Sequence, residues 1–222
     1  MEHQKSGYAY KPNDILKVLN KYCDKADIGL IVNHVEAVPP TFHSRYSSFY
    51  RHYLYRIGVT DLRLHPIIEW RKCYFVNKPF CVEKASEACK LLEGTKNFAS
   101  FCHGLGQLRP EYPTVRTLDL FEIKPGRPLF DPVHDPLYSN ITFYDFHVKA
   151  PSFMYKQVRR MVSVVVAVAQ NRMELDEVRQ LFDNPGTWNS KANTAPPYGL
   201  YLLNVDYKIP QEDEQPQRST EN

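Results

Sequence analysis

Residues 42–57 read FHSRYSSFYRHYLYRI, and the second half of this stretch decides the fold. Over residues 49–57 the aromatic and β-branched side chains favour an extended chain. Because successive side chains of a strand point to opposite faces, Arg51, Tyr53 and Tyr55 then share one face. The sequence therefore predicts a strand at 49–57, around which the other elements are arranged.

The remaining elements mix helices and strands without a regular strand–helix–strand repeat. Apolar residues at helical spacing predict helices, and two-residue alternation predicts strands. The expected helices cover residues 13–23, 82–92, 152–171 and 175–182. The expected further strands cover residues 27–35, 115–123, 141–148 and 200–207, with a proline-rich excursion over 125–138. This pattern predicts an α+β fold, in which helices flank a mixed, mostly antiparallel sheet.

The Pro39-Pro40 pair is the clearest boundary in the chain. Residues 1–40 are expected to form one helix–strand unit, which is too small to fold alone. Residues 41–209 are expected to form the main domain. Residues 210–222 are expected to be a disordered tail, because they carry four acids among Gln, Ser and Pro and have no apolar side chain to anchor them.

Composition restricts the class of protein only broadly. The 28 Lys and Arg residues exceed the 25 Asp and Glu residues by a formal charge of +3, which does not by itself indicate nucleic acid. Five cysteines without a Cys-x-x-Cys pair indicate reduced thiols rather than disulfides or a zinc site.

The chain carries no signal for a membrane or for secretion. The longest apolar run, residues 164–169, is far shorter than the roughly 20 residues that span a bilayer, and the first residues lack a signal-peptide core. We therefore expect an intracellular protein with no membrane partner. The sequence does not indicate whether it works in the cytoplasm, the nucleus or a mitochondrion.

The stretch at 42–57 is rich in arginine and tyrosine, including Arg45, Arg51 and Tyr53. Guanidinium groups bind phosphates, and aromatic faces stack on unpaired bases. This combination suits a negatively charged RNA. On composition alone, an edge strand with solvated arginines is the simpler interpretation.

A second stretch, FMYKQVRRMV at residues 153–162, has the same chemistry. In a helix that begins at Ser152, Tyr155 and Arg159 are four residues apart and emerge on one side, next to the apolar stripe. A half-buried arginine there needs an anion. A structural ion pair and a catalytic role explain Arg159 equally well at this point.

Six segments then occur in a fixed order: FHSR (42–45), RHYLYRI (51–57), LLEGTKNFASF (91–101), VRTL (115–118), FMYKQVRRM (153–161) and APPYGLYL (195–202). Together they resemble the TruA family of tRNA pseudouridine synthases, especially its metazoan pseudouridine-synthase-like branch. The resemblance covers residues 42–207 and extends weakly upstream over residues 13–35.

The resemblance implies an isomerase that converts uridine to pseudouridine in tRNA. The reaction cuts the N-glycosidic bond, turns the base over and rejoins it through carbon, without a cofactor or metal. Tyr53 would be the active-site tyrosine that packs against the uracil, and Arg159 would pair with the catalytic aspartate. Gly199 and Leu200 would help to close the pocket.

The resemblance also implies RNA, in the form of tRNA, as the partner. The target nucleotide must be flipped out of the RNA, which a basic and aromatic cleft favours. Arg45, Arg51 and Tyr155 are accordingly expected to bind the substrate together with Tyr53. Some family members form homodimers, and the sequence leaves open whether this chain does.

The chain departs from the family pattern at the nucleophile. The family's aspartate lies in a Gly-Arg-Thr-Asp-Ala-Gly-Val-His run that these 222 residues do not contain. The one Thr-Asp pair, Thr60-Asp61, follows the Tyr53 strand instead of preceding it and is a weak candidate. Asp119, Asp145 and Asp206 lie in strand patterns without any catalytic mark.

Three interpretations follow from the sequence. The first is an N-terminally incomplete pseudouridine synthase, inert as written, which we expect to self-associate because a partner half of its sheet is missing. The second is a non-enzymatic RNA-binding fragment or pseudoenzyme of the same family. The third is a generic α+β interaction domain, which the ordered motifs disfavour.

Overall fold

The computed structural model describes residues 10–107 and 111–208. The chain divides into two compact units, Met1–Ser47 with Lys208–Asn222, and Ser48–Tyr207. The expected main domain began at residue 41, and the larger unit begins at Ser48. The expected disordered tail at 210–222 lies outside the described residues.

The first unit contains the helix α1, Pro12–Lys25, close to the predicted 13–23. The strand expected at 27–35 is absent, and that prediction is wrong. Among the described residues this segment pairs with no other strand. Instead, the side chain of Asn20 donates a hydrogen bond of 2.9 Å to the Val32 carbonyl and accepts one of 2.8 Å from the Val32 amide. A side chain therefore takes the place of a strand ladder here.

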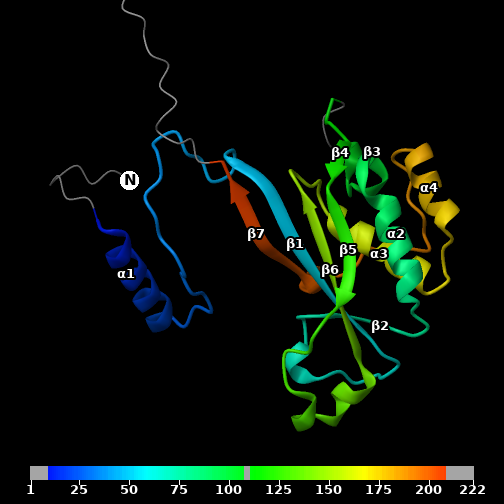
Figure 1. The fold of residues 1–222 in the computed structure, drawn as a ribbon, viewed down its shortest axis with the longest axis horizontal. Coiled ribbons are helices and arrows are strands. Elements are labelled where there is room, and N and C mark those ends of the chain that lie inside the picture. Colours follow the sequence, from blue (N-terminus) through cyan, green and yellow to red (C-terminus); the bar gives the residue numbers. More distant parts are fainter. Residues whose placement is uncertain (1–9, 108–110, 209–222) are drawn as a thin grey trace, which may run out of the picture. The chain divides into compact units, whose positions relative to one another are not determined.

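The second unit is built on β1, Ser48–Val59, the strand predicted at 49–57. On one side β1 pairs antiparallel with β6, Thr142–Ala150, which in turn pairs antiparallel with β5, Leu120–Pro125. On the other side β1 pairs antiparallel with β7, Leu200–Tyr207, and further along parallel with β2, Tyr74–Val76 (Figure 1). This mixed, mostly antiparallel sheet confirms the predicted α+β fold.

The strand expected at 115–123 is two strands in two sheets. β4, Val115–Leu118, pairs with β3, Gly94–Asn97, in a separate two-stranded sheet. The following residues form β5 and pair with β6. The alternation of side chains in the sequence is continuous across Asp119. β4 and β5 are therefore separate strands only because they pair with different partner strands, which the spacing of side chains does not encode.

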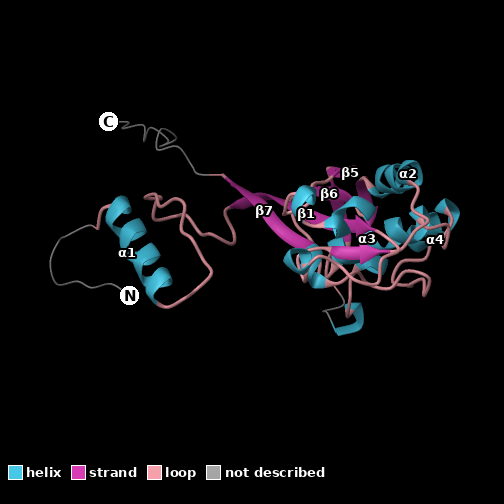
Figure 2. Ribbon diagram, turned by 90° about the horizontal axis from the view of Figure 1, so that it is seen from below, coloured by secondary structure: helices cyan, strands magenta, loops and turns pink. Residues whose placement is uncertain are grey.

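Three helices cover one face of this sheet. α2, Val82–Leu92, has the predicted bounds, and α4, Leu175–Asp183, begins at the predicted residue. α3, Gln157–Ala169, carries the apolar stripe expected of it but begins five residues later than predicted, because Lys156 adopts a left-handed conformation with φ of 60°. α2 and α4 lie side by side (Figures 1 and 2).

The main core lies between the sheet and these helices. Tyr55, Ile57 and Val59 of β1 point into it, together with Phe146 and Val148 of β6. Short 3-10 helices complete the described elements: Ile67–Glu69, Ala99–Phe101, Leu105–Gln107, Pro132–His134, Pro136–Asn140 and Pro197–Gly199. Within the described residues no helix is long and apolar enough to cross a bilayer.

On the opposite face, a buried ion pair ties the loops to β1. Arg56 donates to Glu69 at 3.1 Å and to the Arg127 carbonyl at 2.7 Å. Its Nε also lies 3.7 Å from a carboxylate oxygen of Asp145. Nearby, burial raises the pKa of Cys73 to about 12, which keeps this thiol protonated. All five cysteines are free thiols.

Candidate active site

Tyr53 lies in the middle of β1, between Val148 of β6 and Leu202 of β7. It is half-buried, on the face that the helices cover. Its ring meets the ring of Phe153 edge-on, with 5.2 Å between the ring centroids. The strand therefore fixes the tyrosine beside the turn that leads into α3.

Arg159 lies in the first turn of α3 and is half-buried. Its Nε donates a hydrogen bond of 2.6 Å to the Ala195 carbonyl. Among residues 10–107 and 111–208, no carboxylate lies within 4.0 Å of its guanidinium group. The structure thus holds this positive charge in place without neutralising it.

Tyr55 also belongs to the site, although the sequence analysis assigned it no catalytic or binding role. It is fully buried, and its hydroxyl donates to the Pro196 carbonyl at 2.6 Å. Burial raises the pKa of its hydroxyl, as does Tyr74, whereas the charge of Arg159 lowers it. Tyr55 and Arg159 therefore hold two consecutive carbonyls, and the signal for Tyr55 was its place on the same strand face as Tyr53.

Gly199 and Leu200 pack directly on β1. Leu200 is paired with Tyr55, and a Cβ added at Gly199 would lie 2.8 Å from the Tyr55 ring and 2.9 Å from the Arg56 carbonyl. Only glycine fits this approach. We call the following set the Tyr53–Arg159 site: Tyr53, Tyr55, Arg159, Ala195, Pro196, Gly199 and Leu200.

The other expected substrate-binding residues do not belong to this set. Arg51 lies on the Tyr53 face of β1 and donates to the Pro151 carbonyl at 2.7 Å. Arg45 belongs to the first compact unit, and its guanidinium lies 6.0 Å from the centre of the Tyr46 ring. Tyr155 is not on α3, so the predicted shared helix face with Arg159 is wrong; it lies in the preceding turn and is 63% exposed.

The aspartates considered from the sequence are engaged elsewhere. Asp61 accepts a hydrogen bond of 3.0 Å from the Lys78 amide, beyond the far end of β1. It follows Tyr53 by eight residues, a span of about 25 Å along an extended chain. Asp145 lies beside Arg56 and Asp206 pairs with Lys149, while Asp119 is exposed between β4 and β5.

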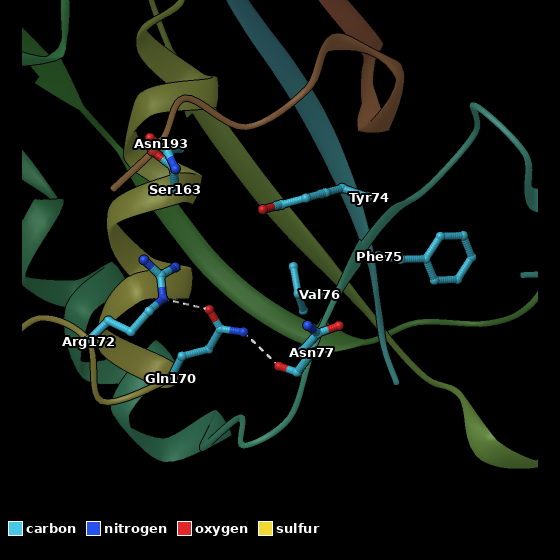
Figure 3. A pocket seen from close by; sticks show the side chains of 8 residues that line it. All are labelled: Tyr74, Phe75, Val76, Asn77, Ser163, Gln170, Arg172 and Asn193. Carbon is cyan, nitrogen blue, oxygen red and sulfur yellow. Dashed lines mark hydrogen bonds between the residues drawn. The ribbon is translucent and has the colours of Figure 1, made fainter. Parts of the chain in front are cut away.

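A polar cavity of about 230 Å³ adjoins α3 one turn beyond Arg159 (Figure 3). It is lined by Tyr74, Phe75, Val76, Asn77, Ser163, Gln170, Arg172 and Asn193. Gln170 joins its two sides, accepting from Arg172 at 3.0 Å and donating to the Asn77 carbonyl at 2.6 Å. The lining side chains in the described part of the chain include no carboxylate, so the cavity offers no anionic partner for Arg159.

Comparison with known proteins shows which family the sequence resembles. The tRNA pseudouridine synthase family model matches residues 88–208. tRNA pseudouridine synthase-like 1 of Xenopus laevis is 33% identical over 168 residues, which is 75% of this chain and 55% of the relative. tRNA pseudouridine synthase A of Methylacidiphilum infernorum is 34% identical over 176 residues (79% and 61%), and that of Brucella anthropi 29% over 192 residues (86% and 68%).

The sheet, the ordered motifs and the family match together define an α+β protein of the pseudouridine synthase type. The chain belongs to the tRNA pseudouridine synthase family, and the resemblance seen in its sequence is confirmed. It spans about half the length of the Xenopus relative.

Proposed function

We propose that this chain is a tRNA pseudouridine synthase that isomerises uridine to pseudouridine at the Tyr53–Arg159 site, without a cofactor or metal. The observation that supports this proposal most is Arg159. The side chain is half-buried and fixed on the Ala195 carbonyl, yet it has no carboxylate partner among residues 10–107 and 111–208. An arginine in this environment is suited to receive an anionic group.

The chemistry assigns a role to each residue. An ionised carboxylate forms the covalent intermediate, and Arg159 lowers its pKa and fixes its position. Tyr53 packs against the flipped-out uracil, and Gly199 and Leu200 close the pocket. Arg45, Arg51 and Tyr155 contact the RNA around the target nucleotide. We further propose that the RNA is a tRNA and that the protein is intracellular. We also propose that two chains pair, which light scattering tests.

A second candidate is a non-catalytic RNA-binding member of the same family. It is favoured by one observation: the 222 residues contain no Gly-Arg-Thr-Asp-Ala-Gly run. This candidate predicts salt-sensitive binding of structured RNA without any change to its uridines.

Conversion and binding of an unmodified tRNA, measured side by side, separate the two candidates. Pseudouridine formation is followed by chromatographic separation of the two nucleosides after digestion of the RNA, because uridine and pseudouridine have the same mass. The assay uses the protein encoded by the complete transcript and its Tyr53→Phe, Arg159→Ala and Arg179→Gln variants. Arg179 is an exposed arginine on α4 and serves as the matched control. If an in-frame Gly-Arg-Thr-Asp-Ala-Gly run precedes Met1, replacing its aspartate tests the nucleophile.

For the enzyme we expect the Tyr53 and Arg159 variants to slow conversion by about a hundredfold or more and the Arg179 variant to leave it unchanged. Binding without conversion by the unmodified protein selects the second candidate. Full turnover by Arg159→Ala would remove the role given to that residue.

A further inference from the structure

The turn that precedes α3 is held in a strained and fixed conformation. Lys156 has φ of 60°, a left-handed conformation that is strained for a residue other than glycine. The buried Gln157 side chain fixes this turn by accepting a hydrogen bond of 2.9 Å from the Met154 amide. The Tyr155 carbonyl also accepts from the His103 amide at 3.1 Å. Such maintained strain is found most often at functional sites.

The turn carries positive charge that is not neutralised. Lys156, Arg159 and Arg160 surround His103, and among residues 10–107 and 111–208 none of these three cations lies within 4.0 Å of a carboxylate. The charge of Lys156 lowers the pKa of His103 most, followed by burial, Arg160 and Arg159. A surface of this kind attracts an anion.

Two of the three cations already have structural contacts. Arg160 donates to the carbonyls of Ser100 and Cys102 at 2.9 and 2.8 Å, and its guanidinium lies 4.3 Å from the centre of the Trp188 ring. Arg159 is fixed on Ala195 as described above. Lys156 is different, because among residues 10–107 and 111–208 its ammonium donates to no backbone carbonyl and lies 5.1 Å from the centre of the exposed Tyr155 ring. It is therefore the cation best placed to meet a phosphate.

An exposed aromatic side chain accompanies the charge. Tyr155 is 63% exposed, and its ring meets the ring of His103 with 5.8 Å between the centroids. Exposed aromatic rings beside cations bind unpaired nucleotides, in which the base stacks and the phosphate meets the cation. The turn also adjoins the Tyr53–Arg159 site, because Phe153 contacts Tyr53 and Arg159 lies in the next helical turn.

We propose that Tyr155, His103 and Lys156 form a subsite for an unpaired RNA nucleotide next to the target uridine. The base stacks on the exposed ring of Tyr155, to which the ring of His103 is inclined by 61°, and its phosphodiester lies at Lys156. This subsite, which we call the Tyr155 subsite, rests on the proposed function for the identity of the ligand. The test measures RNA binding alone, so its result supports or rejects the subsite independently of catalysis.

The experiment measures the affinity for a fluorescent oligouridine of about eight nucleotides over a range of KCl concentrations. The variants are Lys156→Gln, Lys156→Gly, Tyr155→Ala and Tyr155→Phe. Lys156→Gly removes the ammonium from a backbone conformation that glycine adopts without strain, so loss of binding cannot be assigned to misfolding. Lys90→Gln, an exposed lysine in the last turn of α2, is the matched control.

Both Lys156 variants should weaken binding several-fold and reduce the slope of log affinity against log salt by about 0.7. Tyr155→Ala should weaken binding about 5-fold to 150-fold with the slope unchanged, and Tyr155→Phe should restore it. Lys156 variants that match Lys90→Gln at every salt concentration would overturn the subsite, as would an unmodified protein that does not bind the oligouridine. If the variants bind as expected but the protein forms no pseudouridine, the subsite is supported and the catalytic function is rejected.

Discussion

The buried hydroxyl of Tyr55 positions the segment to which Arg159 is fixed. In a Tyr55→Phe variant the Pro196 carbonyl loses its donor in the core, while the ring still packs against Tyr74. We expect a loss of about 1–3 kcal/mol in the free energy of unfolding, measured in urea, because the partly buried Pro196 carbonyl is left without its donor.

The control for this prediction is Tyr201→Phe. The Tyr201 hydroxyl donates to the Lys72 carbonyl at 2.7 Å, but that hydrogen bond is exposed to water. Water can replace the lost donor there, so the loss should be much smaller. Equal losses in the two variants would contradict the role given to burial at Tyr55.

His103 should make RNA binding depend on pH. Lys156 first, then burial, Arg160 and Arg159, hold its pKa in the free protein below the ordinary value of 6.5. A bound phosphate opposes this effect and raises the pKa, so binding takes up a proton. The affinity for RNA should therefore rise as the pH falls below about 6.5. It should level off below the pKa that His103 has in the free protein.

The measurement compares the affinity for oligouridine at pH 7.5 and 5.5 at constant salt. For the unmodified protein we expect a gain of about threefold to tenfold, the effect of one added phosphate contact. His103→Gln has no titratable ring, so its affinity should change much less. An equal gain in both proteins would assign the pH dependence to another group.

Residues of the site differ in how far sequence could identify them. The resemblance indicated Tyr53 and Arg159 by motif, and the structure brings β1 and α3 together in one core. Tyr55, His103 and Lys156 were missed. Tyr55 looks like any core tyrosine until its hydroxyl is seen to bind the Pro196 carbonyl, and His103 meets Tyr155 only through the tertiary fold.

At the level of elements, the short helix Pro197–Gly199 is fitted closely against β1. A Gly199→Ala variant would place its new methyl group 2.9 Å from the Arg56 carbonyl, which cannot move without disturbing the strand. We expect a loss of about 1–3 kcal/mol in stability, as for other overpacked sites. Gly106→Ala is the matched control, since nothing lies within 4 Å of its added Cβ. Thermal unfolding of the two variants tests the difference.

The elements that sequence predicted well are those with local signals. α2 has an apolar stripe and is followed by Gly94, whose φ of 92° suits a helix stop, so its bounds could be read directly. The failures depended on hydrogen bonds between a side chain and the backbone, which the apolar pattern does not encode. The Asn20–Val32 hydrogen bonds replace the strand expected at 27–35, and the Gln157–Met154 hydrogen bond stabilises a turn where helix was expected.

At the scale of the whole molecule, the sheet and its core belong to one unit. All strands of the described residues, together with α2, α3 and α4, lie in Ser48–Tyr207. In the described part of the first unit, Cys23 is the one buried residue, while Val18 and Tyr22 of α1 are 66% and 64% exposed. The unit Ser48–Tyr207 therefore buries much more apolar area than the first unit does. We expect it to contribute most of the free energy of unfolding.

This inequality predicts that a fragment of residues 48–207 folds by itself. A chain of about 150 residues buries some 70% of its unfolded surface, enough for a cooperative core. The fragment should unfold in urea in one transition, with a midpoint close to that of the 222-residue chain, because every strand pair of β1 is retained. Circular dichroism and tryptophan fluorescence should report the same unfolding transition. A fragment that lost its cooperative transition would mean that residues outside 48–207 stabilise the sheet. The boundary at Ser48 would then not separate a stable unit from a dispensable one.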